Sequence, residues 1–171
     1  PLFNLPNVVV TPHLGAATTE AQENVALQVA EQMSDYLLTG AVTNALNMPS
    51  VTAEEAKVMG PWIKLAGHLG NFTGQMTDEP IQAINILYDG EASDMNLKAL
   101  TAATIAGIMK KVNPDTNMVS APVIAKERGI QVSTTKQDQS GTFDGYIKVT
   151  VVTGKRERSV AGTVFSDGKP R

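Results

Sequence analysis

Cysteine is absent from the 171 residues of this chain, and this absence narrows the chemistry that the protein can perform. Without a thiol, the chain forms no disulfide bond, no thiolate nucleophile and no cysteine-ligated zinc or iron–sulfur site. A reducing, cytoplasmic setting is therefore expected. Lysine and arginine are missing from residues 1–50, so the first such side chain is Lys57.

The chain also lacks the features of membrane proteins and nucleic-acid-binding proteins. No apolar run approaches the roughly 20 residues that a helix needs to span a bilayer. The formal net charge of −3 gives no basic surface for nucleic acid, so neither a membrane nor a nucleic acid is an expected partner. His68 has no second histidine or carboxylate at ligand spacing, and no metal site is expected.

The chain also lacks the fingerprint of a dinucleotide-binding site. No G-x-G-x-x-G segment stands between a predicted strand and a predicted helix, so the chain has no recognisable cradle for the phosphates of a dinucleotide. The hydrophobic content of 42% is nevertheless that of a folded globular protein. A chain of this length can bury one good core or two small ones.

The stretch Val8–Ala17, V-V-V-T-P-H-L-G-A-A, is the most informative in the chain. Its three successive valines predict a short buried strand, which Pro12 ends because proline donates no hydrogen bond to a sheet. His13 is then expected just past the end of a strand, the edge at which α/β sheets bind ligands. On spacing alone, a lone histidine is more often structural than catalytic.

A helix and a linker are predicted to follow. Thr19 and Gln22 fit a capping box for a helix that runs to about Leu38, with Gly40 as its left-handed stop. Turn-forming residues fill positions 40–52, and we place a domain boundary near Pro49. The chain is thereby divided into residues 1–48 and residues 49–171.

The second unit has the pattern of an α+β domain. Thr52 and Glu55 form a capping box for a helix that Gly60-Pro61 is predicted to interrupt. Asp94 and Ser120 are predicted to cap two later helices. The predicted strands cover 81–88, 130–136, 146–152 and 159–165, with a further strand expected after Asp167-Gly168. This order predicts a mostly antiparallel sheet with helices on one face.

Several motifs support a resemblance to a known family. The segment V-x-x-T-P-H-L-G-A-x-T-x-E-A-Q around His13 resembles the last signature of the D-isomer-specific 2-hydroxyacid dehydrogenases. The later motifs look like the intervening domain of the long-form D-3-phosphoglycerate dehydrogenases. They are P-W-I-x-L-A-x-x-L-G over 61–70, V-S-A-P over 119–122, and E-x-G before V-S-T-T over 132–135.

The resemblance implies a fold and an activity. Residues 1–48 would contain the last strand and helix of an α/β nucleotide-binding domain, followed by the intervening domain. The whole enzyme would use NAD to oxidise 3-phosphoglycerate to 3-phosphohydroxypyruvate in serine biosynthesis. His13 would be its catalytic acid/base, and Gly15 and Ala16 would border the nicotinamide. The family's substrate arginine and glutamate precede this segment, so the chain is expected to be an incomplete C-terminal fragment and inactive alone.

A second candidate site is a set of basic residues on the last strands. The resemblance implies that this domain binds an anionic effector in some members of the family. Arginine suits phosphate through its bidentate geometry. The alternative is a solvated strand edge, where lysines discourage pairing with other chains. The four residues are Lys136, Lys148, Arg156 and Arg158.

Other readings of the chain remain open. It could be part of another 2-hydroxyacid dehydrogenase, for instance one that acts on glycerate, or a non-catalytic regulatory or assembly module. The apolar stripe Val25, Val29, Met33 and Leu37 gives a reason to expect a homo-oligomer.

Overall fold

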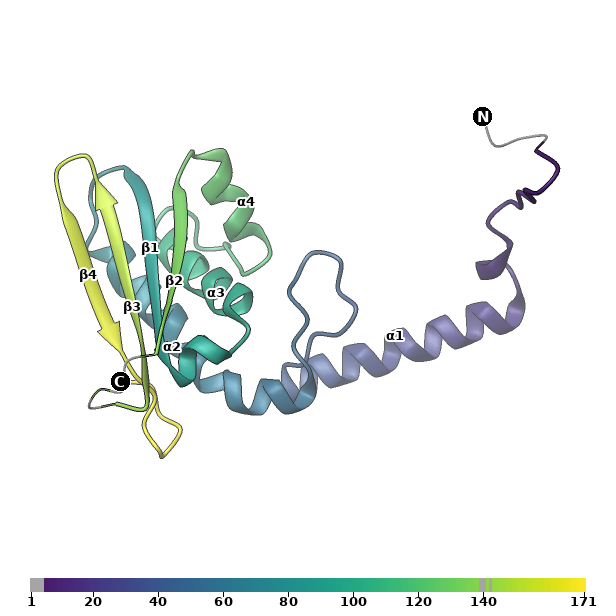
Figure 1. The fold of residues 1–171 in the computed structure, drawn as a ribbon, viewed down its shortest axis with the longest axis horizontal. Helices are drawn as coiled ribbons and strands as arrows, with labels where there is room; N and C mark the ends of the chain where they lie inside the picture. Colours follow the sequence, from purple (N-terminus) through teal and green to yellow (C-terminus); the bar gives the residue numbers. More distant parts are fainter. Residues whose placement is uncertain (1–4, 139–140, 142) are drawn as a thin grey trace.

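The computed structural model describes residues 5–138, 141 and 143–171 of the chain. An N-terminal helix, α1 (Thr19–Thr39), projects away from a body that contains the other helices and a four-stranded sheet (Figure 1). The predicted α+β class is confirmed for this body. The predicted remnant of a nucleotide-binding domain is not confirmed.

The valine strand predicted at the start of the chain is wrong. Val8, Val9 and Val10 form no strand, and the Val9 side chain is 90% exposed. A β-strand needs a neighbour to pair its main-chain groups, and none of the four described strands lies beside this segment. The valines thus have the composition of a buried strand without the surroundings of one.

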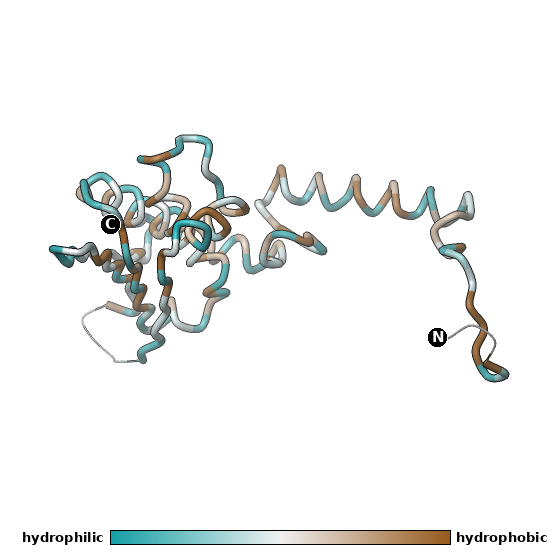
Figure 2. Tube along the Cα trace, turned by 90° about the horizontal axis from the view of Figure 1, so that it is seen from above, coloured by the Kyte–Doolittle hydropathy of each residue, from teal (hydrophilic) through white to brown (hydrophobic). Residues whose placement is uncertain are grey.

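Helix α1 has the predicted length but a different cap. The side chain of Thr18, rather than that of Thr19, accepts a hydrogen bond from the Ala21 N–H at 3.1 Å. Gly40 ends the helix with a φ of 77°, as predicted. None of its residues is buried, and apolar side chains alternate with polar ones along its exposed length (Figure 2).

The linker after α1 is attached to the body. Val42 and Val51 exchange two main-chain hydrogen bonds of 2.7 Å, and both Ala41 and Val51 are buried. The side chain of Asn96 also donates to the carbonyl of Ser50 at 2.8 Å.

Helix α2 (Ala53–Gln75) begins at the predicted capping box of Thr52 and Glu55. The predicted interruption at Gly60-Pro61 is wrong, because the helix continues through both residues. An internal proline costs a helix about 3 kcal/mol, yet α2 buries Met59 before it and Trp62 after it. Packing on both sides of Pro61 therefore outweighs the local penalty.

The sheet has the order β2-β1-β3-β4 and is mixed. Strand β1 (Ile81–Gly90) pairs in parallel with β2 (Gln131–Gln137) and antiparallel with β3 (Gly145–Thr153), which pairs antiparallel with β4 (Glu157–Gly162). Helices α2, α3 (Leu97–Met109) and α4 (Ser120–Glu127) lie on one side of it (Figure 1). The core-facing side chains of the two central strands are buried, as the alternation predicted: Ile84, Ile86, Tyr88, Ile147, Val149 and Val151.

The two predicted helix caps, Asp94 and Ser120, are wrong. Asn96, rather than Asp94, caps α3, while Asp94 belongs to a short 3₁₀ helix, η2 (Glu91–Asp94). The Asn117 side chain accepts from the N–H groups of Val119 and Ser120 at the start of α4. Asparagine caps a helix about as well as aspartate or serine does, so the sequence alone does not decide which of several neighbouring residues is the cap.

Helices α2 and α3 pack at close range. A Cβ atom on Gly70 would overlap the Thr104 carbonyl of α3, and one on Gly74 would lie 2.6 Å from the carbonyl oxygen of Ile108. Glycine at these two positions therefore permits the close approach of the two helices. Gly67 faces open space.

The end of the chain folds back at Asp167-Gly168, and the strand predicted over 159–165 ends early. Thr163 and Arg171 exchange main-chain hydrogen bonds of 2.8 and 2.9 Å, around a turn at Gly168. Strand β4 ends at Gly162, three residues short of the predicted Phe165.

Candidate functional site

His13 lies in an exposed loop ahead of α1. Its φ of −60° and ψ of 59° are those of an inverse γ-turn, closed by a 2.5 Å hydrogen bond from the Leu14 N–H to the Pro12 carbonyl. The turn is built from the predicted T-P-H segment, since proline fixes the backbone on one side of the histidine. The imidazole is therefore presented to solvent by the main chain rather than held in a core.

Gly15 and Ala16 follow in a short 3₁₀ helix, η1 (Leu14–Ala16), and both are exposed. A Cβ atom added to Gly15 would meet no atom within 4 Å. The backbone here is open to the close approach of a planar group, which is the property that the resemblance requires of these two positions.

Within the described part of the chain, no side chain hydrogen-bonds to the imidazole of His13. A catalytic histidine of this kind needs a carboxylate that orients the ring and stabilises the imidazolium. The loop thus contributes one chemical group and an open backbone.

The structure does not bring the four predicted basic residues together. Lys148 pairs with Leu87 and Ala161 and lies on the sheet face that the helices leave uncovered. Lys136 pairs with Tyr88, near the end of β1. Arg158 of β4 pairs with Val151 of β3, which in turn pairs with Ile84 near the start of β1. The expectation of a single cluster is wrong, because strand register places these residues at opposite ends and faces of one sheet.

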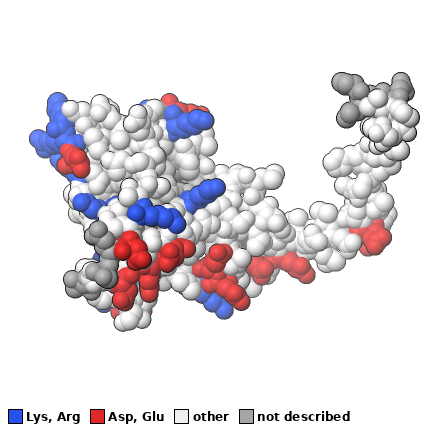
Figure 3. Space-filling model, viewed as in Figure 1, with Lys and Arg blue, Asp and Glu red and all other residues white. Residues whose placement is uncertain are grey.

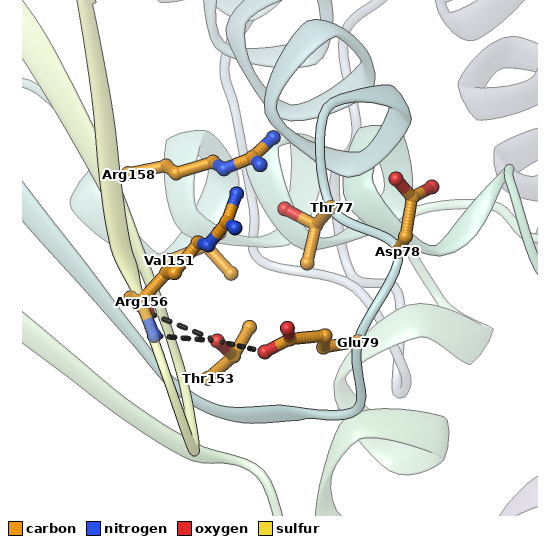
Figure 4. Close-up of a pocket in the computed structure, with 7 residues that line it drawn as sticks. All are labelled: Thr77, Asp78, Glu79, Val151, Thr153, Arg156 and Arg158. Carbon is orange, nitrogen blue, oxygen red and sulfur yellow. Dashed lines mark hydrogen bonds between the residues drawn. The ribbon is translucent and has the colours of Figure 1, made fainter.

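Arg156 and Arg158 do line one pocket, of about 220 Å³, between the β3–β4 turn and the end of α2 (Figure 4). Basic side chains gather over this turn at the upper left of the molecule (Figure 3). The pocket also contains two carboxylates. Thr153 donates to Glu79 at 2.8 Å and accepts from the Arg156 N–H at 3.0 Å.

The other carboxylate, Asp78, pairs with Lys111 at 2.8 Å. Its hydrogen bond with Lys111 and the positive charge of that ammonium lower the pKa of Asp78, with a smaller contribution from Arg158. Since carboxylates share the pocket with the two arginines, its charge does not favour an anion.

Arg158 has a structural partner that the sequence did not indicate. Its guanidinium donates to the carbonyl of Met76, the residue that directly follows α2. Lys111 donates to the next carbonyl, of Thr77, at 2.7 Å. The two contacts join residues 82 and 34 positions apart, so no local pattern in the sequence reports them.

The described residues contain no group of three or more histidine, cysteine, aspartate or glutamate side chains that could hold a metal ion. Among the same residues, no helix is both long and apolar enough to cross a membrane.

Known proteins resemble nearly the whole chain. A curated D-3-phosphoglycerate dehydrogenase of Synechocystis is 36% identical over 167 residues, which are 96% of this chain and 30% of the relative. Its namesake in Bacillus subtilis is 35% identical over 95% of this chain and 31% of the relative. That of Methanocaldococcus jannaschii is 33% identical over 98% of this chain and 32% of the relative.

The chain thus spans about a third of the length of these curated relatives. The family model of the D-3-phosphoglycerate dehydrogenase intervening domain matches residues 58–171, the part that contains most of α2, the whole sheet, α3 and α4. The chain therefore belongs to the D-3-phosphoglycerate dehydrogenase intervening domain family.

Proposed function

We propose that this chain is part of an NAD-dependent D-3-phosphoglycerate dehydrogenase that oxidises 3-phosphoglycerate to 3-phosphohydroxypyruvate in serine biosynthesis. The names of the relatives support the substrate, and the match to the intervening domain supports the long form of the enzyme. The single observation that carries the catalytic assignment is the exposed His13, presented by a γ-turn beside an open glycine.

His13 is the catalytic acid/base in this proposal. Its neutral imidazole takes the proton from the 2-hydroxyl of the substrate, and the pKa of an ordinary histidine suits this transfer near neutral pH. Bound NAD supplies the hydride acceptor. Gly15 and Ala16 border the nicotinamide, where the lack of side-chain bulk permits close approach of the backbone.

In this proposal the chain alone contacts only the nicotinamide end of NAD. The described residues offer the open backbone at Gly15 but no glycine-rich turn for the phosphates of a dinucleotide. In the proposal, the phosphate cradle and the carboxylate partner of His13 lie in the remaining length that the relatives have. The isolated chain is then inactive and does not bind NADH.

We further propose that residues 1–48 belong with the nucleotide-binding domain and residues 49–171 form the intervening domain. The exposed apolar side chains of α1 support this division, because a helix that packs on the same body would bury them. In the whole protein they are covered by the nucleotide-binding domain or by another copy in a homo-oligomer. The absence of cysteine supports a cytoplasmic location.

The catalytic proposal is tested by His13→Ala in the full-length enzyme. We expect kcat to fall by about 10²–10⁴-fold, the usual size of a general acid–base contribution, with NAD affinity nearly unchanged. Steady-state kinetics and an NADH fluorescence titration measure the two quantities. His68→Ala, the other histidine of the chain, is the matched control. A His13→Ala enzyme that keeps more than half of its kcat contradicts the assignment.

A further inference from the structure

Strand β2 forms one edge of the sheet (Figure 1). It pairs with β1 on one side, and within the part of the chain that the structure describes no other segment exchanges main-chain hydrogen bonds with it. Every second residue of an edge strand points its N–H and C=O groups away from the neighbouring strand, so β2 presents a row of unpaired main-chain groups. Residues 131–136 are all exposed, so the described helices leave this edge open.

The sequence of β2 offers little protection against pairing with another strand. Natural edge strands avoid such pairing through prolines, bulges or charged side chains. In Q-V-S-T-T-K-Q the only charged residue is Lys136, proline is absent, and the pairing with β1 runs without a register shift. Its valine and two threonines are β-branched and favour extended backbone. At the opposite edge of the described sheet, β4 contains both Glu157 and Arg158. The β2 edge is therefore the one suited to a further strand.

A second copy of β2 fits this edge because the strand is complementary to itself. In an antiparallel pair centred on Thr134, this residue lies opposite its own copy and Ser133 lies opposite Thr135. Hydroxyl side chains that face each other in this way form cross-strand hydrogen bonds. Lys136 lies opposite Val132, on which its aliphatic stem packs while the ammonium group stays in water. No two like charges face each other in this register.

The same register uses the whole length of the strand. Gln131 lies opposite Gln137, and each amide has both a donor and an acceptor for the other. A two-fold axis perpendicular to the sheet relates the two copies, so two four-stranded sheets join into one of eight strands, with the helices of both copies on one face. A register that set Lys136 opposite its own copy would be unfavourable, because like charges would meet.

We propose that β2 is an interaction surface for a second copy of this chain, bound by antiparallel pairing of β2 with β2 about Thr134. Main-chain hydrogen bonds supply the attraction, and the facing hydroxyl and amide side chains fix the register. A single pair of strands of this length buries less than the roughly 1,200 Å² of a standard stable interface, so the dimer is reversible and forms at high protein concentration. The inference depends on neither His13 nor the proposed function.

The proposal is tested by NMR on the whole ¹⁵N-labelled chain, at concentrations from about 10 μM to about 1 mM, which cover weak association. We expect the amide signals of residues 131–137 to shift with concentration, and sedimentation over the same range to show a monomer–dimer equilibrium. Shifts that exclude residues 131–137 overturn the proposal, and shifts confined to α1 would assign the contact to the exposed apolar side chains of that helix. A chain that stays monomeric over the whole range also overturns it.

Paired charge variants test the register. Ser133→Lys combined with Thr135→Lys sets like charges opposite each other in both symmetry-related pairs, and we expect about tenfold weaker association.

Ser133→Glu combined with Thr135→Lys sets opposite charges there, and this variant should associate at least as tightly as the unmodified chain. The matched control is Glu157→Gln combined with Ser159→Lys, which makes the same change of net charge on the same face at the other edge, where Ser159 lies in the row of Ser133. It should leave association unchanged. Equal weakening by the control and the double lysine variant, or by the two β2 variants, overturns the pairing when the spectra show the native fold.

Discussion

Arg158 of β4 ties the edge of the sheet to the end of α2 through the carbonyl of Met76. The last carbonyls of a helix have no partner within the helix and carry partial negative charge, so cations stabilise them. Lys111 donates to the carbonyl of Gln75, the last residue of α2, at 3.5 Å and to that of Thr77 at 2.7 Å. Arg158 and Lys111 therefore both stabilise the C-terminal end of α2 from outside the helix.

Because of this contact, we expect the Arg158 side chain to stabilise the fold. We expect Arg158→Ala to lower the free energy of unfolding by about 1.5–3 kcal/mol, the range for hydrogen bonds to charged groups. Arg156→Ala is the control, because Arg156 is exposed and no hydrogen bond from its guanidinium is found in the described structure. It should change stability by less than about 0.5 kcal/mol. Urea unfolding measures both, and equal losses would contradict the capping role.

Two glycines of α2 provide a paired test of the helix packing. Gly70→Ala should destabilise the protein by about 1–3 kcal/mol, because the added methyl group overlaps the Thr104 carbonyl of α3. Gly67→Ala should stabilise it by about 0.5–1 kcal/mol, because its methyl group faces open space and alanine favours helix. Thermal and urea unfolding measure both changes. If both variants were stabilised, the helices would not be in contact as described.

Tyr88 should make the protein sensitive to alkali. It is fully buried, and its hydroxyl lies 2.8 Å from Oγ1 of Thr101. Burial raises the pKa of Tyr88 to about 12 from 10.0. Between these values the unfolded chain ionises more readily, so the free energy of unfolding should fall as pH rises, by about 2–3 kcal/mol in all.

The Tyr88 contribution is isolated by Tyr88→Phe, which cannot ionise. Urea unfolding between about pH 9 and pH 12 should show a shallower loss of stability for this variant than for the unmodified chain. Tyr36→Phe, at an exposed tyrosine, should keep the original slope. A Tyr88→Phe slope equal to that of the unmodified chain would contradict the prediction.

The proposed boundary near Pro49 is tested by limited proteolysis. Trypsin has no site in residues 1–50, which lack lysine and arginine, so chymotrypsin is the suitable enzyme. We expect cleavage at Leu46, whose side chain is 104% exposed in the turn between Val42 and Val51. Mass spectrometry should find a resistant fragment that begins after Leu46. A resistant core that retains α1 would show that both units share one core.

Local sequence patterns determined most of the individual elements. The capping box of Thr52 and Glu55 and the left-handed stop at Gly40 each depend on residues within one turn. The alternation around Ile147 and Val149 depends only on the two-residue period of a strand. The T-P-H-L-G segment likewise produces its turn by local geometry. His13 became a candidate through the resemblance of this segment to a family signature, which also needs no knowledge of the fold.

Only the tertiary structure decided which elements persist and which residues meet. The valines at 8–10 lack neighbouring strands and form none, whereas α2 continues through Pro61 because a core surrounds both sides of it. Sheet order and register separate Lys136 from Arg158 and place Arg158 where it donates a hydrogen bond to the carbonyl of Met76. Such contacts join segments far apart in the chain, and their free energies depend on which surfaces are packed together. A local pattern in the sequence therefore does not predict which surfaces pack together.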